Sequence, residues 1–191
     1  LWHAGGLELR MAVNLSARQL RSKNLLRQVK DVVLKHNLQP GQLELEITES
    51  VAMEDADNTL RMLAQLRELG VELAIDDFGT GYSSLSHLKL MPLHRLKIDR
   101  SFVKDIETDP DDAAICAATI SLAHNLGLSV VAEGVETEAQ FAFLGNLGCE
   151  CAQGFLFSKP LPAAELEAWI RARGQMPQSS PPVMPGNSTS V

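Results

Sequence analysis

The sequence has few cysteines and histidines, and neither residue type occurs in a disulfide or metal-binding pattern. The three cysteines, Cys116, Cys149 and Cys151, are odd in number and form no CxxC pair, so neither a disulfide framework nor a structural zinc site is predicted. The five histidines form no HxH or HExxH motif, which argues against a histidine metal centre. This pattern favours a reducing compartment, and we therefore expect a cytoplasmic domain.

Basic charge and long apolar runs are also scarce. The 191-residue chain has 24 acidic and 17 basic residues, which give a net charge of -7. Duplex nucleic acid requires a basic surface, so it is not an expected partner, whereas an acidic chain suits a site that collects divalent cations. No apolar run reaches the length of about 18 residues that a membrane helix needs, and the given sequence shows no signal-peptide pattern. The chain begins with Leu1 rather than methionine, so a membrane anchor elsewhere in the whole protein stays open.

Six apolar segments carry polar residues at or near their ends. The segments read AVNLS, LELEITES, LAIDDFGTG, RLKIDRS, VVAEGVET and CAQGFLF, and their polar residues are Asn14, Glu46, Asp76 with Asp77, Lys97, Glu133 and Gln153. Short leucine-rich or β-branched segments are typical of buried parallel strands. Barrels of alternating strands and helices build their active sites at the carboxyl ends of the strands. The pattern therefore predicts the catalytic rim of an α/β protein with a TIM-like (β/α)8 barrel.

Helical patterns lie between these segments, as a parallel barrel requires. We expect helices over residues 16–37, 55–69, 110–126, 137–147 and 163–172, and a short one over residues 83–88. Ser16 followed by Gln19 predicts a capping box at the first helix. In the third helix, Ile115, Ala118 and Leu122 are predicted to form the buried stripe.

Length limits this barrel. A complete (β/α)8 barrel needs about 250 residues, whereas the chain has 191. We therefore expect about six βα units over residues 1–174, equivalent to the C-terminal three quarters of a barrel whose first strands are missing. Residues 175–191 are rich in proline, serine and glycine and have no apolar periodicity, so we expect a disordered C-terminal tail.

The chemistry of the polar residues points to a hard metal ion. Carboxylate and amide oxygens without imidazole or thiolate select Mg²⁺ or Mn²⁺ before zinc. Asp76 and Asp77 are adjacent, and adjacent strand residues face one site only where the strand ends and twists into its loop. Such a pair is able to hold two metal ions, which activate water and stabilise a phosphoryl displacement. Lys97 would then contact a phosphate oxygen or the water, and Glu133 would accept a proton.

Lys97 has other interpretations. It is able to form a barrel-lining ion pair with Asp99 or with another aspartate. It also suits the base of a Mg²⁺ enzyme that removes a proton next to a carboxylate and stabilises an enediolate. The adjacent aspartates, and the lack of a second lysine at the rim, argue against that rival enzyme class.

The segment after the two aspartates is rich in glycine. Gly79, Thr80 and Gly81 suit a loop that turns tightly and moves beside the site. Glu49 would lie just beyond its strand, where it either braces that loop or serves as a helix N-terminal acid.

Taken together, the motifs VNLS, ELEITES, IDDFGTGYSSL, LKIDRSFV, VVAEGVET and QGFLFSKPLP resemble the EAL domain of bacterial cyclic-di-GMP phosphodiesterases. The resemblance runs from about residue 7 to residue 172. It implies hydrolysis of cyclic-di-GMP to linear pGpG with Mg²⁺ or Mn²⁺. The Glu-Ala-Leu tripeptide itself, whose glutamate is a further metal ligand in that family, would lie on a strand before Leu1 and is absent from this sequence, as is a nearby arginine of the family. We therefore expect this chain on its own to be inactive or nearly so.

The resemblance also implies roles for single residues. The metal ligands would be Asn14, Glu46, Asp76 and Asp77, with Lys97 on the metal-bound water, Glu133 as general base, and Glu49, Asp99, Glu136 and Gln153 in support. The alternative is a receptor for cyclic-di-GMP, or a protein-docking module, that has lost turnover. Members of the family also carry GGDEF or sensor domains upstream and dimerise through the barrel, so both are expected partners in the whole protein.

Overall fold

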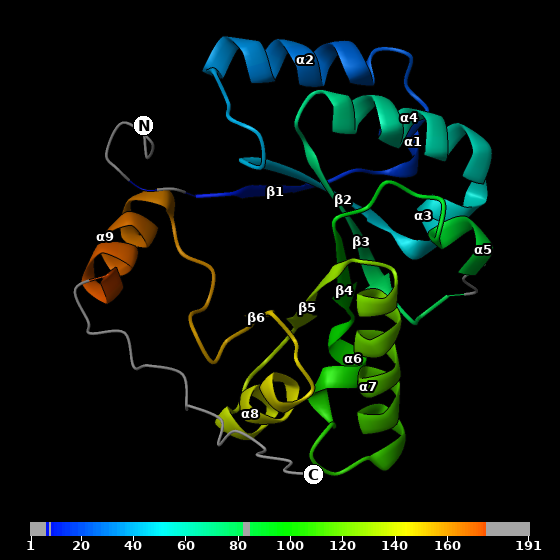
Figure 1. Cartoon of the computed structure of the whole chain (residues 1–191). Coiled ribbons are helices and arrows are strands. Elements are labelled where there is room, and N and C mark those ends of the chain that lie inside the picture. The colour runs from blue at the N-terminus through cyan, green and yellow to red at the C-terminus, as the bar shows by residue number, and fades with distance from the viewer. Residues whose placement is uncertain (1–6, 8, 82–84, 175–191) are drawn as a thin grey trace, which may run out of the picture. The chain divides into compact units, whose positions relative to one another are not determined.

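A computed structural model describes residues 7, 9–81 and 85–174. The chain divides into two compact units, Leu1–Lys159 and Pro160–Val191. The first unit contains one parallel sheet whose six strands follow chain order (Figure 1). They are β1 (Met11–Asn14), β2 (Leu43–Thr48), β3 (Glu72–Phe78), β4 (Arg95–Ile98), β5 (Ser129–Glu133) and β6 (Cys151–Gln153). This is the predicted α/β class, and the strands coincide with the six predicted segments.

Helices follow each strand of the sheet. They are α1 (Ala17–Leu20), α2 (Leu25–His36), α3 (Glu49–Glu54), α4 (Ala56–Glu68), α5 (Leu85–Leu88), α6 (Arg100–Lys104), α7 (Pro110–Asn125) and α8 (Glu138–Asn146), with α9 (Ala163–Gly174) in the second unit. The expected first residues of the short helix, 83 and 84, and the expected disordered tail, 175–191, lie outside the described residues. Across the described part of the chain, no helix combines the length and apolar character that crossing a membrane demands.

The first expected helix is interrupted. The capping box predicted at Ser16 is present, but α1 ends at Leu20 and α2 begins only at Leu25. Between them, the backbone N–H of Asn24 donates to the Ser22 hydroxyl at 3.3 Å. Serine and asparagine side chains compete with helical hydrogen bonds in this way. Leu20, at the end of α1, and Leu25, at the start of α2, are both buried.

The buried face of α7 also differs from the predicted one. Ile115 and Ala118 are exposed and Leu122 is only half-buried, so the predicted stripe is wrong. The sequence of α7 is rich in alanine and apolar on several sides, and its periodicity does not single out one face. Two short helices, α3 and α6, have no counterpart among the predicted helices, because five or six residues carry too little periodicity. The residues of α7 that are buried are Cys116, Thr119, Ile120 and Ala123.

The two faces of the sheet have opposite character. Neighbouring strand residues point to opposite faces, and β2, which reads LELEIT, alternates accordingly. One face carries apolar side chains such as Leu45, Ile75 and Leu96, which join residues of α1, α2, α4 and α7 in a single core. The other, inner face carries charged side chains, of which Glu46 and Lys97 lie near the strand ends. The fold therefore directs its charge to the inside of the curled sheet.

Candidate active site

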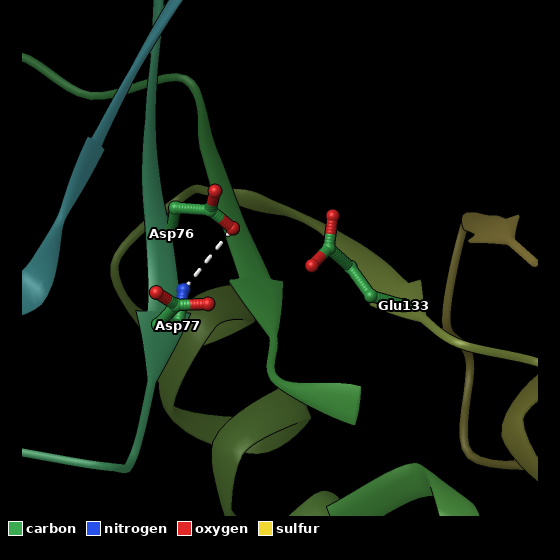
Figure 2. Close-up of side chains that lie close together, drawn as sticks. All are labelled: Asp76, Asp77 and Glu133. Carbon is green, nitrogen blue, oxygen red and sulfur yellow. Dashed lines mark hydrogen bonds between the residues drawn. The ribbon is translucent and has the colours of Figure 1, made fainter. Parts of the chain in front are cut away.

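Neighbouring strands bring the predicted acidic residues together at their carboxyl ends. Glu46 lies on β2, Asp76 and Asp77 lie on β3, Lys97 on β4 and Glu133 on β5. Carboxylate oxygens of Asp76, Asp77 and Glu133 lie within 4.8 Å of one another. Figure 2 shows these side chains converging from β3 and β5. We call Glu46, Asp76, Asp77, Lys97 and Glu133 the rim cluster.

Lys97 lies at the centre of the rim cluster. Its Nζ lies 2.7 Å from Oε1 of Glu133, 2.8 Å from Oε1 of Glu46 and 3.1 Å from Oδ1 of Asp76. Its side chain is only 5% exposed. The ion pair with an aspartate, one of the interpretations of Lys97, is thus present, and two glutamates join it.

Burial and charge shift the pKa values of this cluster in a defined direction. Burial alone lowers the pKa of Lys97, but its hydrogen bonds to Glu133 and Glu46 outweigh burial and raise the pKa above its ordinary value. The ammonium group therefore stays charged. Burial raises the pKa of Glu133, with Lys97 opposing the shift and the carboxylate of Asp76 adding to it. A carboxyl group whose pKa is raised is a better proton acceptor near neutral pH than an ordinary one.

The end of β3 explains how two adjacent aspartates face one site. The pairing of β3 with β4 shifts register between Ile75 and Phe78, and Asp77 adopts a left-handed backbone conformation with φ 53°. The backbone N–H of Asp77 donates to Oδ1 of Asp76 at 3.1 Å. Burial and the carboxylates of Asp76 and Asp99 raise the pKa of Asp77. The strand is therefore irregular at the two aspartates but continues to Phe78, which pairs with Ile98. The shared site arises from this irregularity within β3, whereas the sequence argument expected the strand to end there.

Glu49 connects this turn to α3. It is the first residue of α3, it is 1% exposed, and its Oε2 accepts a hydrogen bond from the backbone N–H of Gly79 at 2.9 Å. The Thr80 hydroxyl donates to the backbone oxygen of Asp77 at 2.8 Å. A Cβ atom at Gly81 would lie 3.2 Å from the carboxylate of Glu49. Glu49 is thus both a helix N-terminal acid and a brace for residues 79–81.

Asn14 and Gln153 lie on the outer strands of the sheet. Asn14 on β1 is in register with Glu46, and Gln153 on β6 is in register with Glu133. Both are exposed. Within the described part of the chain, neither side chain makes a hydrogen bond or ion pair with the rim cluster.

Asp99 and Glu136 have local partners. Asp99 caps α6, because its Oδ1 accepts a hydrogen bond from the backbone N–H of Ser101 at 2.9 Å. The guanidinium of Arg100 lies 3.2 Å from Oε1 of Glu136. The carboxylate of Asp99 also raises the pKa of Asp77, which links this cap electrostatically to the rim cluster.

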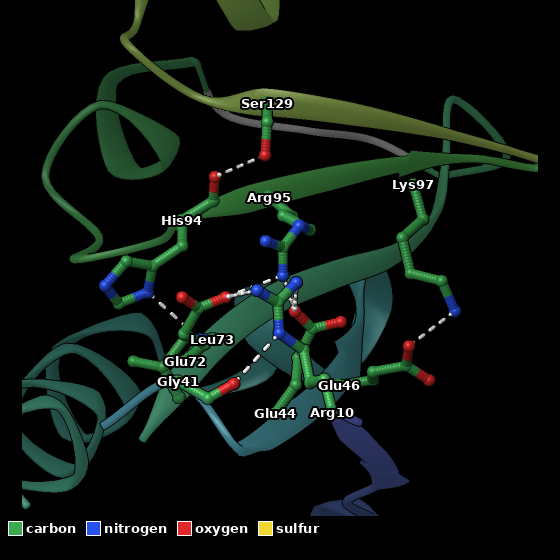
Figure 3. Close-up of polar contacts among 10 residues, drawn as sticks. All are labelled: Arg10, Gly41, Glu44, Glu46, Glu72, Leu73, His94, Arg95, Lys97 and Ser129. Atoms are coloured by element: carbon green, nitrogen blue, oxygen red, sulfur yellow. Dashed lines mark hydrogen bonds and ion pairs between the residues drawn. The ribbon is translucent and has the colours of Figure 1, made fainter. Parts of the chain in front are cut away.

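A second charged layer lies on the same face of the sheet, nearer the amino ends of the strands (Figure 3). The guanidinium of Arg95 contacts both Glu44 and Glu72, with 2.6 Å to Oε2 of Glu72. Arg10 lies 3.6 Å from Glu44 and 3.2 Å from Glu72. We call these four residues the lower ion cluster. They are absent from the predicted site, although the alternation LELE of β2, which places Glu44 beside Glu46 on one face, is a signal that could have found them.

The rim cluster suits a hard divalent cation. Its donors are carboxylate oxygens from β2, β3 and β5, without imidazole or thiolate, which is the ligand set that Mg²⁺ and Mn²⁺ prefer. Four carboxylates face a single ammonium group. The cluster therefore retains negative charge for a bound cation to neutralise.

Comparison with known proteins identifies the family. The sequence model of the EAL domain family matches residues 1–160 of this chain. The chain is 52% identical over 171 residues to the bifunctional diguanylate cyclase/cyclic di-GMP phosphodiesterase MucR of Pseudomonas aeruginosa, a match that covers 89% of this chain and 25% of MucR. It is 50% identical over 169 residues to the cyclic di-GMP phosphodiesterase NbdA of the same organism, covering 88% of this chain and 22% of NbdA. The chain thus spans about a quarter or less of the length of these curated relatives.

Solved structures agree with this assignment. The PaMucR phosphodiesterase in complex with c-di-GMP superposes with a TM-score of 0.84 at 52% identity, over 86% of this chain and 67% of that chain. A manganese and cyclic-di-GMP complex of BlrP1 from Klebsiella pneumoniae superposes with a TM-score of 0.75 at 35% identity, over 83% of this chain and 41% of that chain. The predicted TIM-like α/β fold and the predicted family are therefore confirmed. The chain belongs to the EAL domain family.

Proposed function

We propose that this chain is the metal-dependent core of a phosphodiesterase that hydrolyses cyclic-di-GMP to linear pGpG. The observation that carries the proposal is the rim cluster, in which Asp76, Asp77 and Glu133 converge within 4.8 Å around a buried lysine. MucR and NbdA, both about half identical to this chain, are named as cyclic di-GMP phosphodiesterases. The c-di-GMP complex of PaMucR supports the same ligand.

The metal site would use oxygen ligands from three strands. Glu46, Asp76 and Asp77 would hold Mg²⁺ or Mn²⁺, two ions per site, with the amide of Asn14 on the neighbouring strand. Bound metal ions lower the pKa of a water molecule and neutralise charge on the attacking and leaving oxygens of a phosphodiester. The manganese complex of the BlrP1 relative supports the choice of cation.

The other residues act on protons, charge and position. Glu133 accepts a proton from the attacking water at a carboxylate oxygen whose pKa is raised by burial. Lys97 supplies positive charge to a phosphate oxygen or to that water. Glu49 holds the segment of Gly79, Thr80 and Gly81, and thereby orients Asp77. The supporting residues are Asp99, Glu136 and Gln153.

The domain arrangement is part of the proposal. Residues 1–174 form one phosphodiesterase domain, and the family match over residues 1–160 supports most of this range. MucR combines diguanylate cyclase and phosphodiesterase activities in one protein, which supports GGDEF or sensor domains in the whole protein. A homodimer through the barrel and a cytoplasmic location complete the proposal.

Product formation tests the proposal directly. Cyclic-di-GMP is incubated with Mg²⁺, Mn²⁺ or excess chelator, and pGpG is quantified by chromatography. The assay uses this chain and, in parallel, the protein that its gene encodes in full. We expect metal-dependent pGpG from the full protein and little or none from this chain. Glu133→Gln should lower the rate at least about 100-fold, whereas the exposed Glu68→Gln on α4 serves as the matched control and should not change it.

One outcome would favour a cyclic-di-GMP receptor over an enzyme. If the full protein is folded and binds cyclic-di-GMP but forms no pGpG with either metal ion, the site recognises the dinucleotide without turnover. Calorimetry with cyclic-di-GMP distinguishes this case from a protein that neither binds nor hydrolyses it.

A further inference from the structure

The ammonium group of Lys97 has no hydrogen-bond donor to spare. A lysine ammonium has three N–H donors. Nζ of Lys97 lies 2.7 to 3.1 Å from one carboxylate on each of β2, β3 and β5. The three donors are therefore matched by three carboxylate acceptors. A contact of Lys97 with a phosphate oxygen or a water, as the proposed mechanism needs, requires at least one of these ion pairs to open.

The carboxylates of the rim cluster need a cation to stay together. The side chains of Glu46 and Asp76 are 8% and 11% exposed, and like charges in such surroundings repel strongly unless they are neutralised. The guanidinium groups of Arg10 and Arg95 are already engaged by Glu44 and Glu72 in the lower ion cluster. In the described part of the chain, Lys97 is therefore the cation that holds the rim cluster together.

Two of these carboxylates, Glu46 and Asp76, are also proposed ligands of the metal ions. Glu46 and Asp76 contact Nζ of Lys97 at 2.8 and 3.1 Å, so the ammonium group already neutralises carboxylates that a metal ion would bind. Two cations that share the same carboxylates in a largely buried site repel each other. Lys97 and a metal ion thus compete for Glu46 and Asp76.

We propose that Lys97 is the built-in counter-ion of the metal site, which holds Glu46, Asp76 and Glu133 together without metal and leaves Glu46 and Asp76 when a metal ion binds. The inference rests on the proposed metal site and goes beyond it, because it gives Lys97 two positions with different partners. Released from those carboxylates, the ammonium group has donors for phosphate or water. Metal loading and the catalytic placement of Lys97 are then one event.

A neutral variant of Lys97 tests the competition with metal alone. Binding of Mn²⁺ to this chain is followed by the paramagnetic resonance signal of free Mn²⁺, without nucleotide. Lys97→Met should bind Mn²⁺ at least tenfold more tightly than the native chain, because a competing cation is gone. In chelator its melting temperature should fall, and saturating Mn²⁺ should raise the melting temperature more than in the native chain. A residue with a merely structural role would lower the melting temperature without tightening Mn²⁺ binding.

Two control variants isolate position from charge. Lys104→Met removes the same unit of charge from an exposed side chain on α6, and should leave Mn²⁺ affinity unchanged. Lys97→Arg keeps the charge in place and should bind Mn²⁺ less tightly than Lys97→Met. If Lys97→Met does not fold in chelator, Lys97→Gln is titrated instead, because its neutral amide still donates hydrogen bonds to the carboxylates.

The outcomes separate this inference from the proposed function. Tighter Mn²⁺ binding by the neutral variants supports the role of Lys97 as counter-ion, whether or not the native full protein forms pGpG. Mn²⁺ binding that is equal to or weaker than that of the native chain, or absent from both, overturns it. If the native full protein hydrolyses cyclic-di-GMP but the variants do not bind Mn²⁺ more tightly, the proposed phosphodiesterase function stands and the proposed competition between Lys97 and the metal ion is wrong.

Discussion

At the scale of single residues, the surroundings of the three cysteines give them different reactivities. Burial raises the pKa of Cys116 to about 12 and that of Cys149 to about 11, whereas Cys151 is exposed. Only the thiolate reacts with iodoacetamide, and a raised pKa keeps the thiol protonated until the pH approaches that value. We therefore expect Cys151 to be labelled first at neutral pH, and labelling of Cys149 to accelerate as the pH rises.

Mass spectrometry of timed iodoacetamide reactions measures these rates. Labelling in denaturant provides the control, because all three thiols are then equally accessible. Labelling of Cys116 at the rate of Cys151 in the folded protein would contradict the burial of Cys116 at the contact between α7 and the sheet.

Single residues of the site were predictable where chemistry and position coincide. Asp76, Asp77, Lys97 and Glu133 stand at strand ends and carry groups that packing alone does not demand, so their meeting follows from the parallel sheet. The partners of Lys97 were not predictable, because a lysine side chain reaches several strands and its contacts depend on the curl of the sheet. The left-handed backbone of Asp77 was hidden for a related reason, since it arises from the register shift between β3 and β4.

At the scale of elements, the lower ion cluster ties β2, β3 and β4 together. Arg95 is 13% exposed, and its guanidinium lies between Glu44 and Glu72. Removing one partner of a buried ion pair leaves an uncompensated charge, which costs about 3 to 5 kcal/mol. We therefore expect Arg95→Met to lower the free energy of unfolding by about 3 kcal/mol, as measured by urea denaturation with circular dichroism.

Two variants test the origin of that loss. Adding Glu44→Gln to Arg95→Met removes one of the stranded carboxylates and should restore part of the stability. Arg21→Met removes an exposed ion pair with Glu54, and such pairs contribute about 0.5 kcal/mol. Equal losses from Arg95→Met and Arg21→Met would show that burial does not set the strength of the lower ion cluster.

Elements were predictable in proportion to the clarity of their patterns. The predicted helix ends at residues 69 and 137 agree with the structure. Leu69 is the C-cap of α4 and is followed by Gly70 with φ 80°, and Thr137 forms a capping box at α8. These residue types have local conformational reasons to stand at helix ends. The interruption between α1 and α2 contains a side-chain hydrogen bond of Ser22, which the expectation of one helix over residues 16–37 did not include. The face of α7 was set by packing in the core, and its own sequence does not determine it.

At the scale of the molecule, the order of the six strands follows from chain order, because right-handed crossovers place consecutive parallel strands side by side. It was harder to predict that charged side chains would occupy the inner face of the sheet. Most barrel interiors are filled by bulky apolar residues, whereas the inner face of this sheet carries both the lower ion cluster and the rim cluster. Figure 3 shows the lower ion cluster with Glu46 and Lys97 of the rim cluster. Two charged layers are stable together because the lower one is balanced internally, with two arginines against two glutamates.

The same sheet has an exposed edge, and its composition predicts self-association. All four residues of β1 are exposed, including Met11 at 50% and Val13 at 42%, and among the described strands β1 pairs only with β2. An exposed apolar edge strand is a template for pairing with another chain, and a lysine on the edge opposes such pairing. We expect the chain to associate as its concentration rises, and Val13→Lys to reduce the association without lowering the melting temperature. Size-exclusion chromatography with light scattering measures the association, and thermal denaturation measures the melting temperature, with the exposed Val32→Lys on α2 as the matched control. A native chain that stays monomeric at every concentration, or an equal effect of the two lysine variants, would assign the exposed edge no part in assembly.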